Sequence, residues 1–193
     1  MKRTLILASE SPRRKELLKC LGATFEVMPA YADELEKGED PEKLPELNAL
    51  LKAAAVADKF PGAFVLGADT GVFDGVQMLG KPRSQDHAVS MLLSLSGRSH
   101  RVISGVALIC RELKLELSWS VTSAVTFGKY GRAEISEYMK LVNVMDKAGS
   151  YAIQEHPELL GARWEGELEN IIGLPVVKLQ EVLEKYHLTG CAG

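Results

Sequence analysis

The sequence begins with a short apolar run, Thr4-Leu5-Ile6-Leu7, which is followed at once by Ala8-Ser9-Glu10-Ser11-Pro12-Arg13-Arg14. An apolar run that ends in a hydroxyl-rich turn indicates a buried strand leading into a helix. Ser11 suits the N-cap position and Pro12 the first helical turn, where its missing N–H costs nothing. Free backbone N–H groups, two serine hydroxyls and two guanidiniums would then meet at a point that suits phosphate. The alternative is an ordinary strand–helix corner with a solvated arginine pair.

Helical and strand patterns alternate along the rest of the chain. Helices are expected over 13–21, 46–59, 84–95, 133–142 and 176–186, and strands over 25–28, 64–66, 100–110 and 115–127. The expected apolar stripe of helix 46–59 consists of Leu47, Leu50, Leu51, Ala54 and Ala57. Asp74-Gly75 predicts a tight hairpin turn, and Asn170-Ile171-Ile172 a short strand before the last helix. Helices mixed with hairpins favour an α/β fold with a mixed sheet over a purely parallel one.

Length and composition exclude several classes of protein. The 193 residues suit one large domain or two small lobes around a shared cleft, and we expect a single domain over 1–188 with a frayed tail over 189–193. The net charge of −3 and the aromatic content of 6% argue against a nucleic-acid binder. No apolar run approaches the length of a membrane helix, and the run after Lys2-Arg3 is too short for a signal peptide. Three widely spaced cysteines indicate neither disulfides nor zinc, so a reducing cytoplasm is expected.

Candidate chemical groups lie where the regular patterns are interrupted. Asp69, in Gly67-Ala68-Asp69-Thr70, is expected at the end of strand 64–66, as a base, a metal ligand or simply a cap of the turn. Lys81, in Gly80-Lys81-Pro82, is either a cation on a stiff turn or solvated surface. Arg98 is either a phosphate ligand or a helix-end cation. No nucleotide-binding G-x-x-x-x-G-K-[ST] loop or strand-linked G-x-G-x-x-G is present.

Taken together, these segments resemble the Maf family. The shared motifs, in family order, are S-x-S-P-R-R at 9–14, G-A-D-T at 67–70, G-K-P at 80–82, L-S-G-R at 95–98 with His100, D-K-A-G at 146–149 with Tyr151 and Gln154, and G-L-P at 173–175. The resemblance implies an elongated, mixed-sheet α/β fold related to inosine triphosphatases, with two lobes around a central nucleotide cleft. It also implies hydrolysis of a nucleoside triphosphate between the α and β phosphates, to the monophosphate and pyrophosphate.

Roles follow from the resemblance and from what this reaction needs. Asp69 matches the family's proton acceptor, and Lys52 and Lys81 would act as catalytic cations beside the phosphates, although Lys52 could instead extend along its helix toward solvent. Ser9, Arg13 and Arg14 would bind substrate. Carboxylates such as Asp69 and Glu34 suit Mg²⁺ or Mn²⁺, and Asp33 and Glu36 are alternatives to Glu34.

Three positions predict the pyrimidine branch of the family. Arg13, Thr70 and Gln154 match the members that hydrolyse dTTP and UTP, and a carboxamide suits the mixed edge of uracil or thymine. Glu155-His156-Pro157 departs from the family pattern, so modified pyrimidine triphosphates remain candidate substrates. The alternatives are a 7-methyl-GTP-type pyrophosphatase and a nucleotide-binding regulator of septum formation. The resemblance also allows a homodimer.

Overall fold

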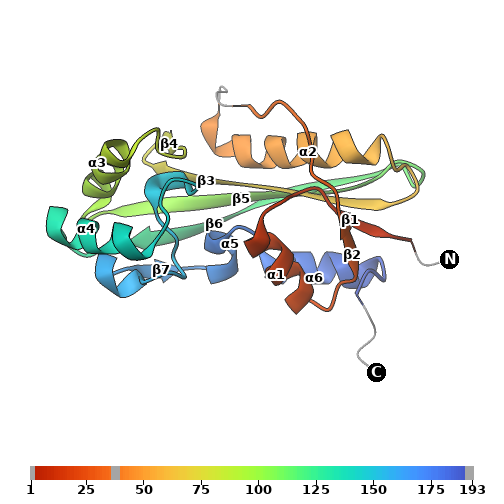
Figure 1. Ribbon diagram of the computed structural model, residues 1–193. Helices are drawn as coiled ribbons and strands as arrows, with labels where there is room; N and C mark the ends of the chain where they lie inside the picture. Colours follow the sequence, from red (N-terminus) through yellow and green to blue (C-terminus); the bar gives the residue numbers. More distant parts are fainter. Residues whose placement is uncertain (1–2, 36–39, 190–193) are drawn as a thin grey trace. The chain divides into compact units, whose positions relative to one another are not determined.

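The computed structural model describes residues 3–35 and 40–189 (Figure 1). The predicted tail, except Thr189, and the alternative ligand Glu36 therefore lie outside the described residues. The chain divides into two compact units, one made of Met1–Thr70, Ser104–Val121 and Gly173–Gly193 and the other of Gly71–Ile103 and Thr122–Ile172. Strands β3 (Phe64–Asp74), β5 (Ser99–Cys110) and β6 (Leu115–Thr126) each contribute residues to both units.

The strands form a mixed sheet, as predicted. Their order is β2-β1-β3-β5-β6-β7, with β4 paired to β3. Strand β1 (Leu5–Leu7) is parallel to β2 (Phe25–Val27) and to β3, whereas β4 (Gln77–Leu79) is antiparallel to β3 and β7 (Arg163–Glu165) is antiparallel to β6. The predicted hairpin joins β3 to β4, but its turn residues are Gly75, at φ +60°, and Val76, one position later than expected, because Asp74 pairs with Gln77 in the strands.

In the first unit, helices cover both faces of the strands (Figure 1). Alternate side chains of β1 and β3 point to opposite faces. Leu5, Leu7 and Leu66 pack with helices α1 (Pro12–Cys20) and α6 (Val176–Lys185). Ile6 and Val65 pack on the other face against α2 (Leu44–Ala57), which follows the short helix η1 (Pro41–Lys43). Burial on both faces explains why these strands are apolar throughout rather than alternating.

Two glycines let the backbone of α2 lie directly on the strands. A Cβ atom on Gly67 would come within 2.2 Å of the Ala49 carbonyl oxygen, and one on Gly105 within 2.3 Å of the Pro45 backbone. Any side chain at these positions would push α2 away. The close approach places Asn48 and the following turn of α2 over β3.

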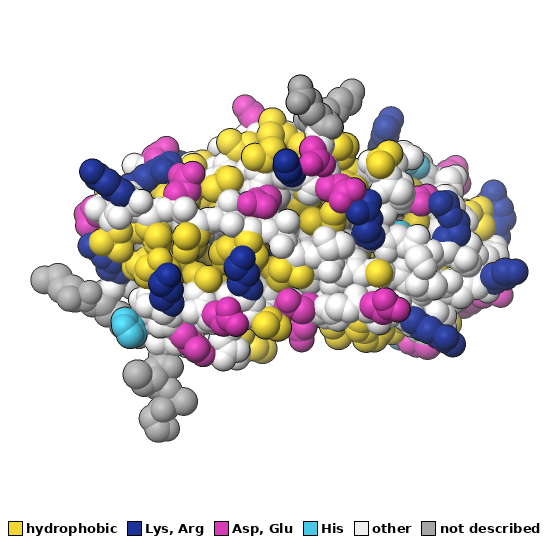
Figure 2. All heavy atoms as spheres, turned by 180° about the vertical axis from the view of Figure 1, so that it is seen from behind, with side chains coloured by type: hydrophobic (Ala, Val, Ile, Leu, Met, Phe, Trp, Pro, Cys, Tyr) yellow, Lys and Arg dark blue, Asp and Glu magenta, His cyan; other side chains and the backbone are white. Residues whose placement is uncertain are grey.

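The second unit has its own apolar core. It contains α3 (Gln85–Leu95), α4 (Arg132–Leu141), α5 (Leu168–Ile172) and the short helices η2 (Ala148–Ser150) and η3 (Pro157–Leu160). Leu92, Leu95, Phe127 and Tyr138 lie in its core. Among the described residues, no helix has the length and apolar character needed to cross a membrane. On the face seen in Figure 2, basic and acidic side chains are interspersed.

Three other local predictions are wrong. Strand β3 continues through Gly67 to Asp74, so Asp69 lies within a strand rather than after one. Residues 170–172 belong to helix α5, not to a strand. On α2, Leu47 and Leu51 are exposed, because the face against the strands is formed by small residues such as Ala49 and Ala53.

Candidate active site

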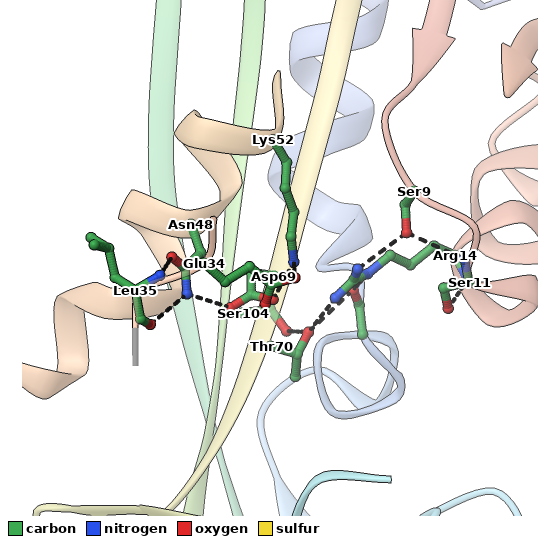
Figure 3. Close-up of polar contacts among 11 residues, drawn as sticks. Ser9, Ser11, Arg14, Glu34, Leu35, Asn48, Lys52, Asp69, Thr70 and Ser104 are labelled. Atoms are coloured by element: carbon green, nitrogen blue, oxygen red, sulfur yellow. Dashed lines mark hydrogen bonds and ion pairs between the residues drawn. The ribbon is translucent and has the colours of Figure 1, made fainter. Parts of the chain in front are cut away.

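A connected cluster of polar side chains in the first unit surrounds Asp69 (Figure 3). Its Oδ1 atom lies 2.7 Å from the Lys52 ammonium, which also lies 3.0 Å from Oε1 of Glu34. The Lys52 side chain is only 11% exposed and that of Asp69 17%. One ammonium therefore holds two carboxylates from different segments, and Lys52 does not extend freely into solvent.

Asn48 completes the surroundings of Asp69. Its side chain is buried, and its Nδ2 atom donates to Asp69 Oδ2 at 3.3 Å. The same carboxamide accepts from the Leu35 N–H at 2.7 Å and donates to the Leu35 carbonyl at 3.1 Å. Sequence reasoning missed Asn48. Its signal was a polar residue four positions before Lys52, a spacing that puts both on one face of a helix.

The Ser9–Arg14 segment forms the predicted strand–helix corner. Ser11 is the N-cap of α1, with its hydroxyl accepting from the Arg14 N–H at 3.4 Å, and Pro12 occupies the first turn. The Ser9 hydroxyl accepts from the Ser11 N–H at 3.3 Å and from Arg14 Nη1 at 3.2 Å. Since both acceptor positions of that oxygen are used, its O–H remains to donate to a ligand oxygen.

Arg14 connects this corner to β3. Its Nε atom donates to the Gly173 carbonyl at 2.9 Å, and its Nη2 atom to the Thr70 hydroxyl at 3.1 Å. With the bond to Ser9, three of its five N–H donors are engaged within the described residues, which leaves two. Removal from water lowers the pKa of the guanidinium, and the neighbouring charge of Arg13 adds to this, while Asp69 and Glu34 oppose it.

Two further residues shape the cluster. The Thr70 hydroxyl lies 2.8 Å from that of Ser104, a fully buried residue of β5 that sequence reasoning did not select. Arg13, half-buried beside Arg14, makes no side-chain hydrogen bond or ion pair with any residue that the structure describes. Its guanidinium is therefore available to a ligand.

The remaining predicted residues lie in the second unit. Lys81 and Gln154 are both exposed there, Gln154 directly after the buried Ile153. The guanidinium of Arg98 donates two hydrogen bonds, of 2.8 and 2.7 Å, to the two carboxylate oxygens of Asp74. This pairing gives Arg98 a structural role. His100 is buried, with Nε2 at 2.8 Å from the Tyr151 hydroxyl.

The carboxylates of Asp69 and Glu34 supply some, but not all, of the ligands that a hard divalent ion needs. Within the described residues, no group of three or more His, Cys, Asp and Glu side chains could hold a metal alone. Asp69 and Glu34 nevertheless direct oxygens at one shared cation, the Lys52 ammonium. Two carboxylates are enough for Mg²⁺ or Mn²⁺ when waters and substrate phosphates supply the other ligands.

Comparisons with known proteins agree with this architecture. The Ham1 protein of Staphylococcus aureus has a similar fold, with a TM-score of 0.55, 12% identity, and coverage of 95% of this chain and 99% of that one. The family model described as Maf-like protein matches residues 4–186. The chain therefore belongs to the Maf family, as its motifs predicted.

Curated relatives are similar over nearly their whole length. A protein of Akkermansia muciniphila named dTTP/UTP pyrophosphatase is 44% identical over 180 residues, which cover 93% of this chain and 94% of the relative. One of the same name from Symbiobacterium thermophilum is 42% identical over 193 residues, covering 98% of each.

Proposed function

We propose that this protein is a nucleoside triphosphate pyrophosphatase that hydrolyses dTTP and UTP to the nucleoside monophosphate and pyrophosphate. The observation that carries the proposal is the Asp69 carboxylate, fixed by Lys52 at 2.7 Å in the strand position next to Thr70. Family membership and the names of the relatives support the same reaction.

In this reaction Asp69 accepts a proton from the attacking water. The water oxygen bonds to the α phosphorus, and the bond from that phosphorus to the oxygen shared with the β phosphate breaks. The electron pair leaves on that oxygen, which becomes a terminal oxygen of pyrophosphate. Lys52, at 2.7 Å, orients the Asp69 carboxylate. Arg13, the two remaining donors of Arg14 and the Ser9 O–H are suited to phosphate oxygens, which carry the charge that develops.

Mg²⁺ or Mn²⁺ is the proposed cofactor, held by Asp69 and Glu34. When bound, such an ion neutralises phosphate charge and makes a coordinated water more acidic. Lys81 and Gln154 keep their predicted roles as a phosphate cation and a reader of the base. A homodimer, a cytoplasmic location and modified pyrimidine substrates also remain proposals.

The test compares initial rates of pyrophosphate release from dTTP, UTP and 7-methyl-GTP with Mg²⁺ or Mn²⁺. Preference for the pyrimidine nucleotides is expected, and preference for 7-methyl-GTP would overturn the assignment. Asp69→Asn should lower turnover by about 10²- to 10⁴-fold while nucleotide still binds. If the wild-type protein binds triphosphates but releases no pyrophosphate, the alternative of a nucleotide-binding regulator is correct.

A further inference from the structure

The side chain of Asn48 hydrogen-bonds both to the Asp69 carboxylate and to the backbone of Leu35, the residue that follows Glu34. Its carboxamide uses its one oxygen and both N–H donors for this purpose. The side chain is 3% exposed, so the bonds compete little with water. An apolar residue at this position would pack equally well. Packing alone therefore does not explain why a buried carboxamide is found here.

These hydrogen bonds restrain the two groups that pair with Lys52. The pair of bonds to Leu35 fixes the backbone directly beside Glu34, whose carboxylate reaches Lys52 at 3.0 Å. The third bond restrains Oδ2 of Asp69, while Lys52 restrains Oδ1. Asn48 thus restrains the Asp69 carboxylate directly and Glu34 through the backbone of Leu35, while Lys52 pairs with both carboxylates (Figure 3).

We propose that Asn48 is a positioning residue that holds the Asp69 carboxylate and the Glu34–Leu35 segment together at the Lys52 ammonium. The inference rests on the proposed pyrophosphatase function and adds to it a residue that the family motifs did not indicate. Restraint of a catalytic carboxylate by an outer partner typically changes turnover by about 10- to 100-fold.

The first experiment measures kcat and KM of Asn48→Leu, Asn48→Gln and the wild-type protein with UTP. Leucine keeps the branched heavy-atom shape and removes all three hydrogen bonds, whereas glutamine returns a carboxamide on a longer stem. We expect Asn48→Leu to lower kcat about 10- to 100-fold with KM changed less than about threefold, and Asn48→Gln to regain part of the loss. Wild-type kcat in Asn48→Leu would overturn the proposal.

Val56→Ala is the matched control on the same helix. Val56 is 1% exposed and packs in the same core as Ala53, outside the polar cluster. This variant should unfold at a lower temperature and keep the wild-type kcat. If it loses kcat as Asn48→Leu does, the effect is merely structural and the proposal fails. Should Asn48→Leu not fold, Asn48→Ser, which shortens the side chain and breaks the same bridge, replaces it.

A second readout needs no enzymatic activity. The Leu35 amide donates to Asn48 Oδ1 at 2.7 Å and should exchange its hydrogen slowly in the wild-type protein and at least about tenfold faster in Asn48→Leu. Equal exchange in the two proteins overturns the positioning role. If the wild-type protein releases no pyrophosphate, the proposed function fails, yet Leu35 exchange still decides whether Asn48 holds this segment.

Discussion

The ammonium of Lys52 lies 2.7 Å from the carboxylate of Asp69, and both side chains are largely buried. A charge pair removed from water stabilises the fold only while both partners are present, because either one alone is a poorly solvated charge. Glu34 adds a second carboxylate at 3.0 Å from the same ammonium. Lys52 is therefore the residue on which the arrangement of the two carboxylates depends.

Lys52→Met keeps the unbranched stem and removes the ammonium. Asp69 and Glu34 would then repel each other without a shared cation, so we expect the free energy of unfolding to fall by about 1–3 kcal/mol. Turnover with UTP should fall at least about 100-fold, because the carboxylate loses its restraint and the phosphates lose a nearby cation. Urea denaturation and steady-state kinetics measure the two effects.

The control for this variant is Lys19→Met. Lys19 pairs with Glu16 at 2.9 Å, but both side chains are more than 60% exposed. Such a pair contributes less than about 1 kcal/mol. Equal losses of stability in the two variants would contradict the distinction drawn between the buried and the exposed pair.

Local features such as helix starts and hairpins could be predicted from the sequence. The corner at Ser11 and Pro12 was confirmed because capping and the proline preference for a first helical turn are local effects. The hairpin after β3 was confirmed as well, but its turn falls on Gly75 and Val76 rather than on Asp74 and Gly75, because Asp74 still pairs with Gln77. The Maf motifs also predicted the family, which the comparison confirmed.

Residues whose identity depends on distant contacts could not be predicted. Gly67 looked like the end of a strand, but it is glycine because the backbone of α2 lies against it. The same contact requires small or polar residues on the face of α2 that lies against the strands. The leucines at 47 and 51 were therefore a misleading guide to the buried face. Asn48 was missed because its partners, Asp69 and Leu35, come from other segments.

Thr70→Val tests the hydroxyl that Arg14 and Ser104 share. Valine has nearly the same shape but cannot accept from Arg14 Nη2 at 3.1 Å or bond to Ser104 at 2.8 Å. We expect Arg14 to lose its fixed direction and KM for UTP to rise about tenfold, about 1.4 kcal/mol of binding. Thr70→Ser keeps the hydroxyl and should bind as the wild type does. A wild-type KM in Thr70→Val would show that this hydroxyl does not serve substrate binding.

His100 should make the fold sensitive to mild acid. It is buried against Phe127 and Tyr151, and burial lowers its pKa from 6.5 to about 4, with the charge of Asp74 opposing this and that of Arg98 adding to it. The unfolded chain therefore binds a proton between pH 6.5 and 4 that the folded chain does not. Stability conferred by neutral His100 is complete above pH 6.5 and falls by up to about 3 kcal/mol as the pH approaches 4.

Urea denaturation at several pH values measures this dependence. Because carboxylates also titrate near pH 4, the wild-type protein is compared with His100→Phe, which cannot bind the proton. The difference in unfolding free energy between the two proteins should change by about 3 kcal/mol between pH 7 and 4, in favour of the variant at low pH. A difference independent of pH would mean that His100 is not held neutral.

Gly105→Ala tests whether the contact between α2 and the strands positions the candidate site. A Cβ atom at this position would meet the Pro45 backbone at 2.3 Å, so α2 must move or the strand must bend. We expect a loss of at least about 2 kcal/mol in unfolding free energy. Movement of α2 would also displace Asn48 and Lys52 from Asp69, so turnover with UTP should fall about tenfold or more in the protein that remains folded.

Gly131→Ala is the control, since its Cβ would meet nothing closer than 3.6 Å and its φ of −120° suits alanine. If the two variants have the same stability and turnover, the close approach of α2 does not set the geometry around Asp69.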